Sequence, residues 1–243
     1  MTENDNTEAH EVSAVKHKYG RINKDYAMQL ATCAPEVDGP IYMVNLMKYF
    51  EIAQYDDPSA TAISGREADD KYNPVSVLNK IGANIVFVAD VLRNHVGDED
   101  WDRIAIVRYA TRVSFIEMQS RKDFSEKHVH KAAGMLRTTL LASRPLDESL
   151  DNRDRPTPLE FRYLVMVVRQ TDNRREVFAN PDAVSFDVEG TVLSDGRFWD
   201  TVQLIPATNE HEADALAQSM TDLVAGTSYA MTLRATIDGL TTN

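Results

Sequence analysis

The chain has 243 residues and a formal net charge of −12. This length allows one large domain or two small ones, each with its own hydrophobic core. Because phosphate backbones bind clustered Lys and Arg, the acidic balance argues against a nucleic-acid partner. The single cysteine, Cys33, excludes an intramolecular disulfide and a cysteine-based metal site.

No apolar run reaches the roughly 20 residues that a membrane-spanning helix needs. Residues 1–10 are polar and acidic, unlike a secretory or mitochondrial leader. We therefore expect a soluble, cytoplasmic protein that has no membrane partner.

Residues 1–37 are predicted to form an N-terminal helical arm. Apolar residues recur there at steps of three and four, which is the spacing of an amphipathic helix. Pro35 and Pro40 end this pattern. The recurring residues are Val12, Val15, Tyr19, Ile22, Tyr26 and Leu30.

Residues 38–146 are predicted to form a β-α-β-β-α-β unit with the ferredoxin-like arrangement. Its opening strand, 41–50, is rich in β-branched and aromatic residues. An insertion, 51–64, leads to a helix over 66–81, which Pro74 should kink or divide. The remaining predicted elements are a hairpin of strands 83–92 and 101–109, a helix over 113–134 and a strand over 136–143.

A charged linker containing proline, 147–158, precedes a second predicted unit over 159–243. This unit is degenerate, because 173–180 has room for two helical turns at most where a full first helix would stand. Its other predicted elements are a strand over 161–169, a hairpin of strands 183–193 and 198–205, a helix over 210–225 and a strand over 228–237.

A Trp-Asp pair occurs twice, as Trp101-Asp102 and Trp199-Asp200. Each pair follows a turn-like segment and stands between two apolar runs. The recurrence predicts two copies of one hairpin-centred unit. Since both copies keep the pair, we interpret it as scaffold rather than as a functional site.

A sheet with helices on one face leaves its other face apolar and uncovered. Two such sheets within one chain can bury these faces against each other. The predicted fold class is therefore α+β, with two tandem ferredoxin-like units that pair their sheets as an α+β barrel pseudo-dimer, preceded by the helical arm. Association of two chains into a homodimer stays open.

Five segments of the first predicted unit carry a resemblance to a known family. They are 39–49 (GPIYMVNLMKY), 65–68 (GREA) with Tyr72, 101–109 (WDRIAIVRY), 114–118 (SFIEM) and 130–133 (HKAA). Together they resemble domain-of-unknown-function family 1330, which belongs to the dimeric α+β barrel superfamily.

The resemblance covers residues 38–143 and implies a ligand cavity between sheet and helices. It implies no particular reaction, because the superfamily includes cofactor-independent monooxygenases, muconolactone isomerases, haem-dependent members and proteins without known activity. The chain departs from the family by its insertion at 51–64 and by its fused second unit.

Asn45 is the first candidate catalytic residue. It interrupts an apolar strand, and by strand alternation it should share a face with Met43 and Met47. A buried amide needs hydrogen-bond partners, and a substrate carbonyl or enolate oxygen is one candidate. The alternative is an amide that fixes a neighbouring loop.

Arg66 and Tyr72 lie on the first predicted helix. Arg66 is a candidate substrate-binding residue for a carboxylate or enolate, and Tyr72 is a candidate catalytic hydrogen-bond donor. The alternatives are a surface arginine paired with Asp69 or Asp70, and an aromatic packing residue.

His128 and His130 lie close to the end of the helix predicted over 113–134. Two residues apart, they point in different directions, so they cannot bind a metal ion together. We assign His130 as the candidate catalytic acid or base and His128 as a candidate substrate-binding residue. The alternative is a helix-end histidine that interacts with free carbonyl groups. No metal site is expected.

These candidates favour a cofactor-independent enzyme of isomerase, lyase or monooxygenase type, acting on a small apolar metabolite that bears oxygen. In this hypothesis Asn45 and Tyr72, or Asn45 and Arg66, hold a carbonyl or enol oxygen. His130 moves a proton, and no organic cofactor is bound. The alternatives are a non-catalytic small-molecule-binding or structural α+β barrel protein and a haem-dependent enzyme.

Overall fold

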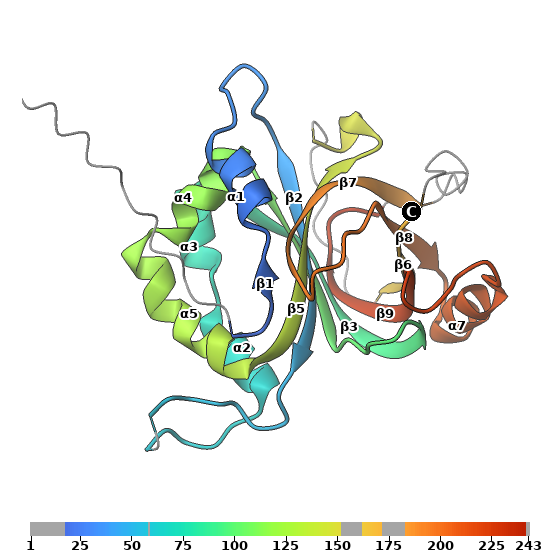
Figure 1. The fold of residues 1–243 in the computed structure, drawn as a ribbon. Helices are drawn as coiled ribbons and strands as arrows, with labels where there is room; N and C mark the ends of the chain where they lie inside the picture. Colours follow the sequence, from blue (N-terminus) through green and yellow to red (C-terminus); the bar gives the residue numbers. More distant parts are fainter. Residues whose placement is uncertain (1–17, 58, 152–161, 172–182, 242–243) are drawn as a thin grey trace, which may run out of the picture.

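The computed structural model describes residues 18–57, 59–151, 162–171 and 183–241. Eight antiparallel strands form a closed barrel, in the order β7-β5-β2-β4-β3-β9-β6-β8, and pairing of β7 with β8 closes it (Figure 1). A short strand, β1 (Arg21–Ile22), pairs along β7 outside the ring. The ring strands are β2 (Ile41–Tyr49), β3 (Asn84–Val96), β4 (Arg103–Tyr109), β5 (Met135–Pro145), β6 (Arg162–Arg169), β7 (Val184–Ser194), β8 (Thr201–Ala207) and β9 (Ser228–Asp238).

The predicted fold class is wrong, because the molecule is one closed β-barrel with a few helices rather than two ferredoxin-like α+β units. The predicted sheets do not pack face to face. They join edge to edge, with Val91 of β3 opposite Leu233 of β9 and Leu141 of β5 opposite Thr191 of β7. Edge pairing satisfies the N–H and C=O groups that each separate sheet would leave free, and closure removes every edge. The ferredoxin-like tandem repeat is therefore not supported.

The barrel interior is filled by side chains that alternate along each strand. On β2, Tyr42, Val44 and Leu46 point inward and belong to the main core, while Met43 and Met47 belong to clusters on the outer face. A period of two is the consequence of the pleated strand. The interior is thus a packed core, and the outer face of β2 is available to a site.

The two tryptophans of the Trp-Asp pairs meet inside the barrel. The rings of Trp101 and Trp199 lie 5.6 and 4.7 Å from that of Tyr229, between centroids. Asp102 accepts hydrogen bonds from the backbone N–H of Tyr49, at 2.9 Å, and from Lys48 Nζ, at 2.7 Å. Trp101, Trp199 and Asp102 therefore contribute to core packing and strand pairing.

Five helices cover the outer face of β2, β4 and β5, and α7 (Glu210–Ser219) lies against β6 and β9 on the other side (Figure 1). Two predicted long helices are each divided. The first breaks at Asn73, whose φ is 22°, ahead of Pro74, because proline lacks the N–H that would continue the helix. The five helices are α1 (Lys24–Ala31), α2 (Gly65–Tyr72), α3 (Val75–Lys80), α4 (Arg112–Gln119) and α5 (Lys122–Gly134).

The predicted short segment 173–180 lies outside the described residues, as do 1–17 of the N-terminal arm and most of the predicted linker. The first residues of that linker form a short 3-10 helix, Glu148–Asp151. No helix in the described ranges combines the length and the apolar composition that crossing a membrane requires.

Candidate functional site

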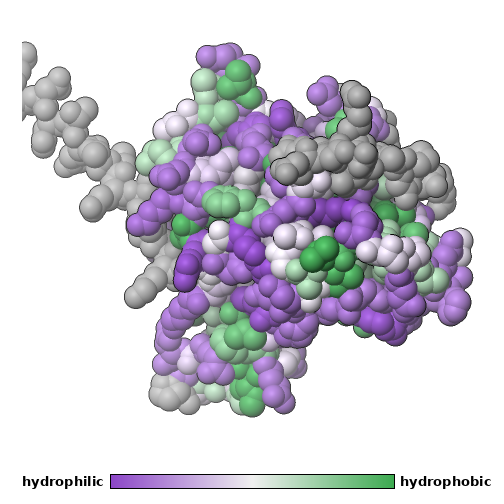
Figure 2. Space-filling view, turned by 45° about the vertical axis from the view of Figure 1, so that its right-hand side comes forward, coloured by the Kyte–Doolittle hydropathy of each residue, from purple (hydrophilic) through white to green (hydrophobic). Residues whose placement is uncertain are grey.

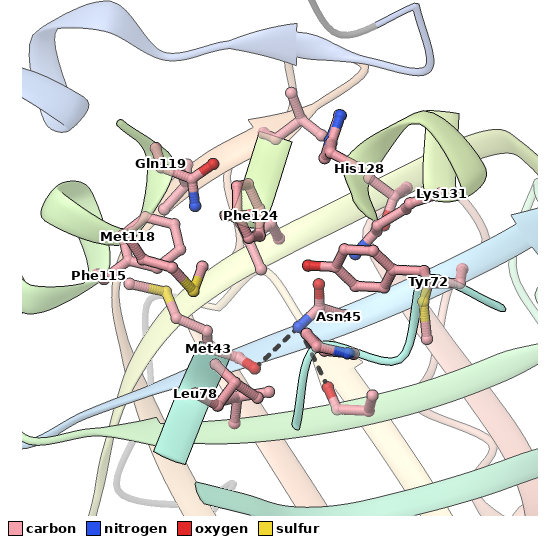
Figure 3. A pocket seen from close by; sticks show the side chains of 18 of the residues that line it. Met43, Asn45, Tyr72, Leu78, Phe115, Met118, Gln119, Phe124, His128 and Lys131 are labelled. Atoms are coloured by element: carbon pink, nitrogen blue, oxygen red, sulfur yellow. Dashed lines mark hydrogen bonds between the residues drawn. The ribbon is translucent and has the colours of Figure 1, made fainter. Parts of the chain in front are cut away.

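A cavity of about 760 Å³ lies between the outer face of the barrel and the helices. Strands β2 to β5 form its floor, and α1 to α5 contribute to its walls. Small-molecule sites commonly have volumes of roughly 300–1,000 Å³ and mostly apolar walls. The apolar side chains drawn around this cavity are Met43, Leu78, Phe115, Met118 and Phe124 (Figure 3).

Asn45 lies on the cavity floor, on the same face of β2 as Met43 and Met47. Its side-chain NH₂ donates to the carbonyl oxygens of Met43, at 3.1 Å, and Ala105, at 3.4 Å (Figure 3). Since both acceptors are carbonyls, the nitrogen must face them and Oδ1 must face away. Oδ1 is turned toward the cavity, and no described residue donates a hydrogen bond to it. The floor thus presents one hydrogen-bond acceptor.

Tyr72 is the last residue of α2, and its hydroxyl points into the cavity (Figure 3). Its ring is 8% exposed and meets the rings of Phe124 and His128 edge-on, at 6.0 and 6.5 Å between centroids. Burial raises the pKa of the phenol well above its ordinary value, because desolvation disfavours the anion. The hydroxyl therefore keeps its proton. Within the described ranges no side chain or backbone group hydrogen-bonds to it.

The structure separates the two histidines of α5. His128 is buried in the cavity wall, and its Nε2 lies 2.9 Å from the hydroxyl of Tyr19. His130 lies outside the lining, with Nδ1 2.8 Å from the hydroxyl of Tyr55 in the insertion 51–64. Two residues are roughly 200° of helical rotation, so the two rings lie on opposite sides of α5.

Arg66 also lies outside the lining. Its Nη2 is 2.7 Å from Asp90 Oδ1, and its Nε is 3.7 Å from Asp70 Oδ1. These ion pairs hold the guanidinium over the strands next to α2. Of the five predicted site residues, the cavity therefore brings together Asn45, Tyr72 and His128.

Lys131 is a cavity residue that the sequence analysis missed. His128 follows Phe124 by four residues, and Lys131 follows His128 by three. All three side chains therefore share one face of α5. Its Nζ lies 5.4 Å from the centroid of the Tyr72 ring, a cation–π distance. Burial lowers the pKa of its ammonium group, and the charge of Asp69 opposes part of that effect. The helical spacing was the sequence signal that would have found it.

Asp69 is already engaged at the edge of the cavity. Tyr49 donates its hydroxyl proton to Asp69 Oδ2 at 2.6 Å. Arg103 Nη1 lies 3.5 Å from the same oxygen and 2.8 Å from Asp70 Oδ1. Lys131 makes no ion pair with Asp69 or with any other described carboxylate.

Metal ligation has no candidate site in the described part of the chain. No group of three or more His, Cys, Asp or Glu side chains is close enough there to hold an ion.

Comparison with known proteins gives no family. No family model matches the chain, and no curated protein matches it. The predicted membership of domain-of-unknown-function family 1330 is therefore not confirmed.

Three solved structures resemble parts of the chain. A protein of unknown function from Rhodopseudomonas palustris and its methylated form are each 27% identical, with a TM-score of 0.45; both match 53% of this chain, and 98% and 96% of their own. A protein from Fusobacterium nucleatum subsp. nucleatum, provisionally named a monooxygenase, is 12% identical, with a TM-score of 0.40 over 85% of this chain and 97% of its own. At these TM-scores the likenesses carry no argument about the reaction.

Proposed function

We propose that the protein binds a small, mostly apolar molecule bearing an oxygen function in the cavity between β2 and α5. It converts this molecule without a bound organic cofactor, by isomerisation, lyase chemistry or attack of dioxygen on a substrate carbanion. The observation that supports the proposal is the cluster of Asn45 Oδ1, Tyr72 OH and Lys131 Nζ in a mostly apolar cavity (Figure 3).

The two uncharged groups of this cluster complement a carbonyl or enol. The hydroxyl of Tyr72 donates to the substrate oxygen, and Oδ1 of Asn45 accepts from an enol or hydroxyl proton. Apolar walls strengthen both hydrogen bonds, because the local dielectric constant is lower than that of water. The substrate skeleton packs against the methionine and phenylalanine side chains of the walls.

His128 supports the proposal as a wall residue whose ring is held by Tyr19. We assign no substrate contact to His130 or Arg66. Both lie outside the lining, where His130 hydrogen-bonds to Tyr55 and Arg66 forms an ion pair with Asp90. His130→Ala therefore serves as a control from the same helix as His128.

A screen of small apolar ketones, aldehydes, enols and phenols tests the proposal. Binding is followed by thermal shift and calorimetry, and conversion by mass spectrometry of the small molecule. We expect Asn45→Ala and Tyr72→Phe to lower kcat/KM by roughly 10²-fold, the usual loss for a transition-state hydrogen bond, and His130→Ala to leave it unchanged.

The competing function is non-catalytic binding. One observation favours it: the NH₂ of Asn45 is used to fix the backbone at Met43 and Ala105. A ligand that binds in the cavity and is recovered unchanged under every condition would establish the binding protein instead. Conversion that persists at full rate in both Asn45→Ala and Tyr72→Phe would place the reaction elsewhere.

A further inference from the structure

Lys131 is a partly buried lysine that lines the cavity. Lys48, Lys80 and Lys122 form ion pairs with aspartate or glutamate, at N–O distances of 2.6, 2.8 and 3.9 Å. Lys131 forms none in the described part of the chain, and its nitrogen is directed into the cavity. A second lysine, Lys24, also lines the cavity, but it is exposed at the start of α1.

The environment of Lys131 disfavours its charged form. The nitrogen is directed into the mostly apolar cavity, where it lies 5.4 Å from the centroid of the Tyr72 ring (Figure 3). Desolvation lowers the pKa of the group. Asp69 acts in the opposite sense, and its carboxylate also accepts hydrogen bonds from Tyr49 and Arg103. A neutral lysine amine is a nucleophile for carbonyl carbon.

We propose that Lys131 is the nucleophile of this cavity and forms an imine with the carbonyl group of an apolar aldehyde or ketone. This inference rests on the proposed function and narrows it. It assigns the substrate class, apolar aldehydes and ketones, and it adds a covalent intermediate to the reaction. The amine, the phenol and the amide oxygen that the step requires all line the cavity.

The step balances without an oxidant or reductant. The lone pair of Nζ forms a bond to the carbonyl carbon, and the C=O π pair moves to oxygen, which takes up one proton while the nitrogen releases one. The hydroxyl group of the resulting carbinolamine takes up a second proton and leaves as water, while the nitrogen lone pair forms the C=N bond. Release of the second proton from nitrogen gives the neutral imine. The sum is amine plus carbonyl giving imine plus water.

Two neighbouring side chains fit the proton movements. Tyr72 stays protonated at neutral pH and donates to the carbonyl oxygen as negative charge develops there. Oδ1 of Asn45 accepts a hydrogen bond from the carbinolamine hydroxyl.

An imine restricts the reactions open to the site. Once protonated, it withdraws electrons from the adjacent carbon and makes its C–H bond more acidic. That effect serves isomerisation and carbon–carbon bond cleavage. It favours the isomerase and lyase forms of the proposed function over attack of dioxygen.

Reductive trapping tests the inference directly. The full-length protein is incubated at pH 7 with benzaldehyde and sodium cyanoborohydride, which reduces the imine to a stable benzylamine. Intact mass and peptide mapping then give the rate of modification at each lysine. We expect Lys131 to react at least about twofold faster than Lys24, because a lowered pKa raises the fraction of neutral amine at pH 7.

Matched variants complete the test. Lys131→Met should abolish the fast modification and Lys24→Arg should leave it, with circular dichroism confirming that both are folded. Equal rates at Lys131 and Lys24 in the unaltered protein would overturn the inference without any variant. If a carbonyl compound is bound and converted but no Lys131 adduct forms, the inference that Lys131 forms an imine is wrong, and the proposed function is retained. If an adduct forms but no carbonyl compound is converted, Lys131 is a nucleophile, and the proposed enzymatic function is wrong.

Discussion

Gly65 and Gly134 bring the backbone at the start of α2 into contact with the backbone at the end of α5. A Cβ added to either glycine would overlap the carbonyl oxygen of the other. The contact matters for the cavity because α2 ends in Tyr72 and α5 carries Lys131. Two small residues thus fix the separation of the two helices that bring the phenol and the amine together.

Gly134→Ala is expected to destabilise the protein by about 1–3 kcal/mol, since the overlap must be relieved by moving one helix. The measurement is the free energy of unfolding from urea denaturation. Gly39→Ala is the matched control, because a Cβ there meets nothing within 4 Å, and we expect a change of at most about 0.5 kcal/mol. Equal midpoints for the two variants would show that α2 and α5 do not depend on close approach.

The sequence predicted the floor of the cavity better than its walls. Alternation along β2 placed Asn45 on one face with Met43 and Met47, and the structure has them there. This succeeded because the side-chain period of a strand is local and does not depend on what the strand pairs with.

The closure of the sheet could not be predicted in the same way. Face-to-face packing and edge-to-edge pairing bury the same apolar residues, so the hydrophobic pattern does not distinguish them. The two arrangements differ in which strands pair at their edges. In this barrel, segments distant in the sequence pair, and Phe87 lies opposite Asp238 and Leu140 opposite Leu193. Lys131 was missed for a related reason: a lysine near a helix end is usually solvated, and here it is partly buried in the cavity wall.

Lys131→Met is expected to stabilise the protein by about 1 kcal/mol or more at pH 7. The replacement removes a partly buried cation that forms no ion pair with a described carboxylate, and it keeps a side chain of similar length. Residues kept for chemistry often lower stability in this way. The free energy of unfolding of both proteins, from urea denaturation at pH 7, gives the difference. A loss of stability would mean that the ammonium has a structural partner.

The stability difference between Lys131→Met and the unaltered protein should depend on pH. Burial lowers the folded-state pKa of Lys131 below its ordinary value of 10.5, so in the window between them the unfolded chain binds more protons. Stability of the unaltered protein therefore rises with pH through that window. The advantage of Lys131→Met should shrink as urea midpoints are measured from pH 7 toward pH 10. An advantage that grows with pH would contradict a lowered pKa.

Tyr72→Phe and Tyr49→Phe separate a functional hydroxyl from a structural one. The two side chains are almost equally buried, at 8% and 7% exposed. The hydroxyl of Tyr49 donates to Asp69, whereas that of Tyr72 has no partner among the described residues. We expect Tyr49→Phe to cost about 1–3 kcal/mol, because it leaves a buried carboxylate short of a donor, and Tyr72→Phe to cost about 0.5 kcal/mol or less.

Denaturation of both variants, together with conversion of an identified substrate, checks this pair. Activity should follow the opposite order, with Tyr72→Phe the more damaging. If Tyr72→Phe were as destabilising as Tyr49→Phe, the hydroxyl of Tyr72 would belong to the scaffold rather than to the site.

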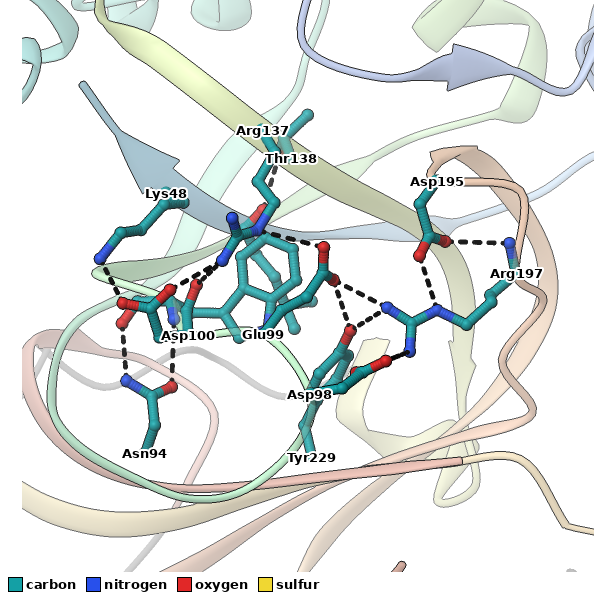
Figure 4. A network of polar contacts seen from close by, with 12 residues as sticks. Lys48, Asn94, Asp98, Glu99, Asp100, Arg137, Thr138, Asp195, Arg197 and Tyr229 are labelled. Carbon is teal, nitrogen blue, oxygen red and sulfur yellow. Dashed lines mark hydrogen bonds and ion pairs between the residues drawn. The ribbon is translucent and has the colours of Figure 1, made fainter. Parts of the chain in front are cut away.

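Arg197 links the turn after β3 to β9 and to the turn before β8 (Figure 4). Its Nη1 donates to Asp98 at 2.8 Å, and its Nη2 donates to Glu99 at 2.8 Å and to the hydroxyl of Tyr229 at 2.6 Å. Its Nε donates to Asp195 at 2.7 Å. Hydrogen bonds from several nitrogens in one plane are a property of guanidinium that lysine lacks.

Arg197→Lys keeps the positive charge but is expected to destabilise the barrel by about 1–3 kcal/mol. One ammonium group cannot donate hydrogen bonds to all the partners of the guanidinium. Arg121→Lys is the surface control, since among the described residues the side chain of Arg121 bonds only to Asp123, and exposed pairs contribute about 0–1 kcal/mol. Urea denaturation at low and high salt measures both. A loss for Arg197→Lys that disappears in 1 M salt would identify screened surface charge, whereas one that persists identifies the hydrogen-bond geometry that joins the two turns.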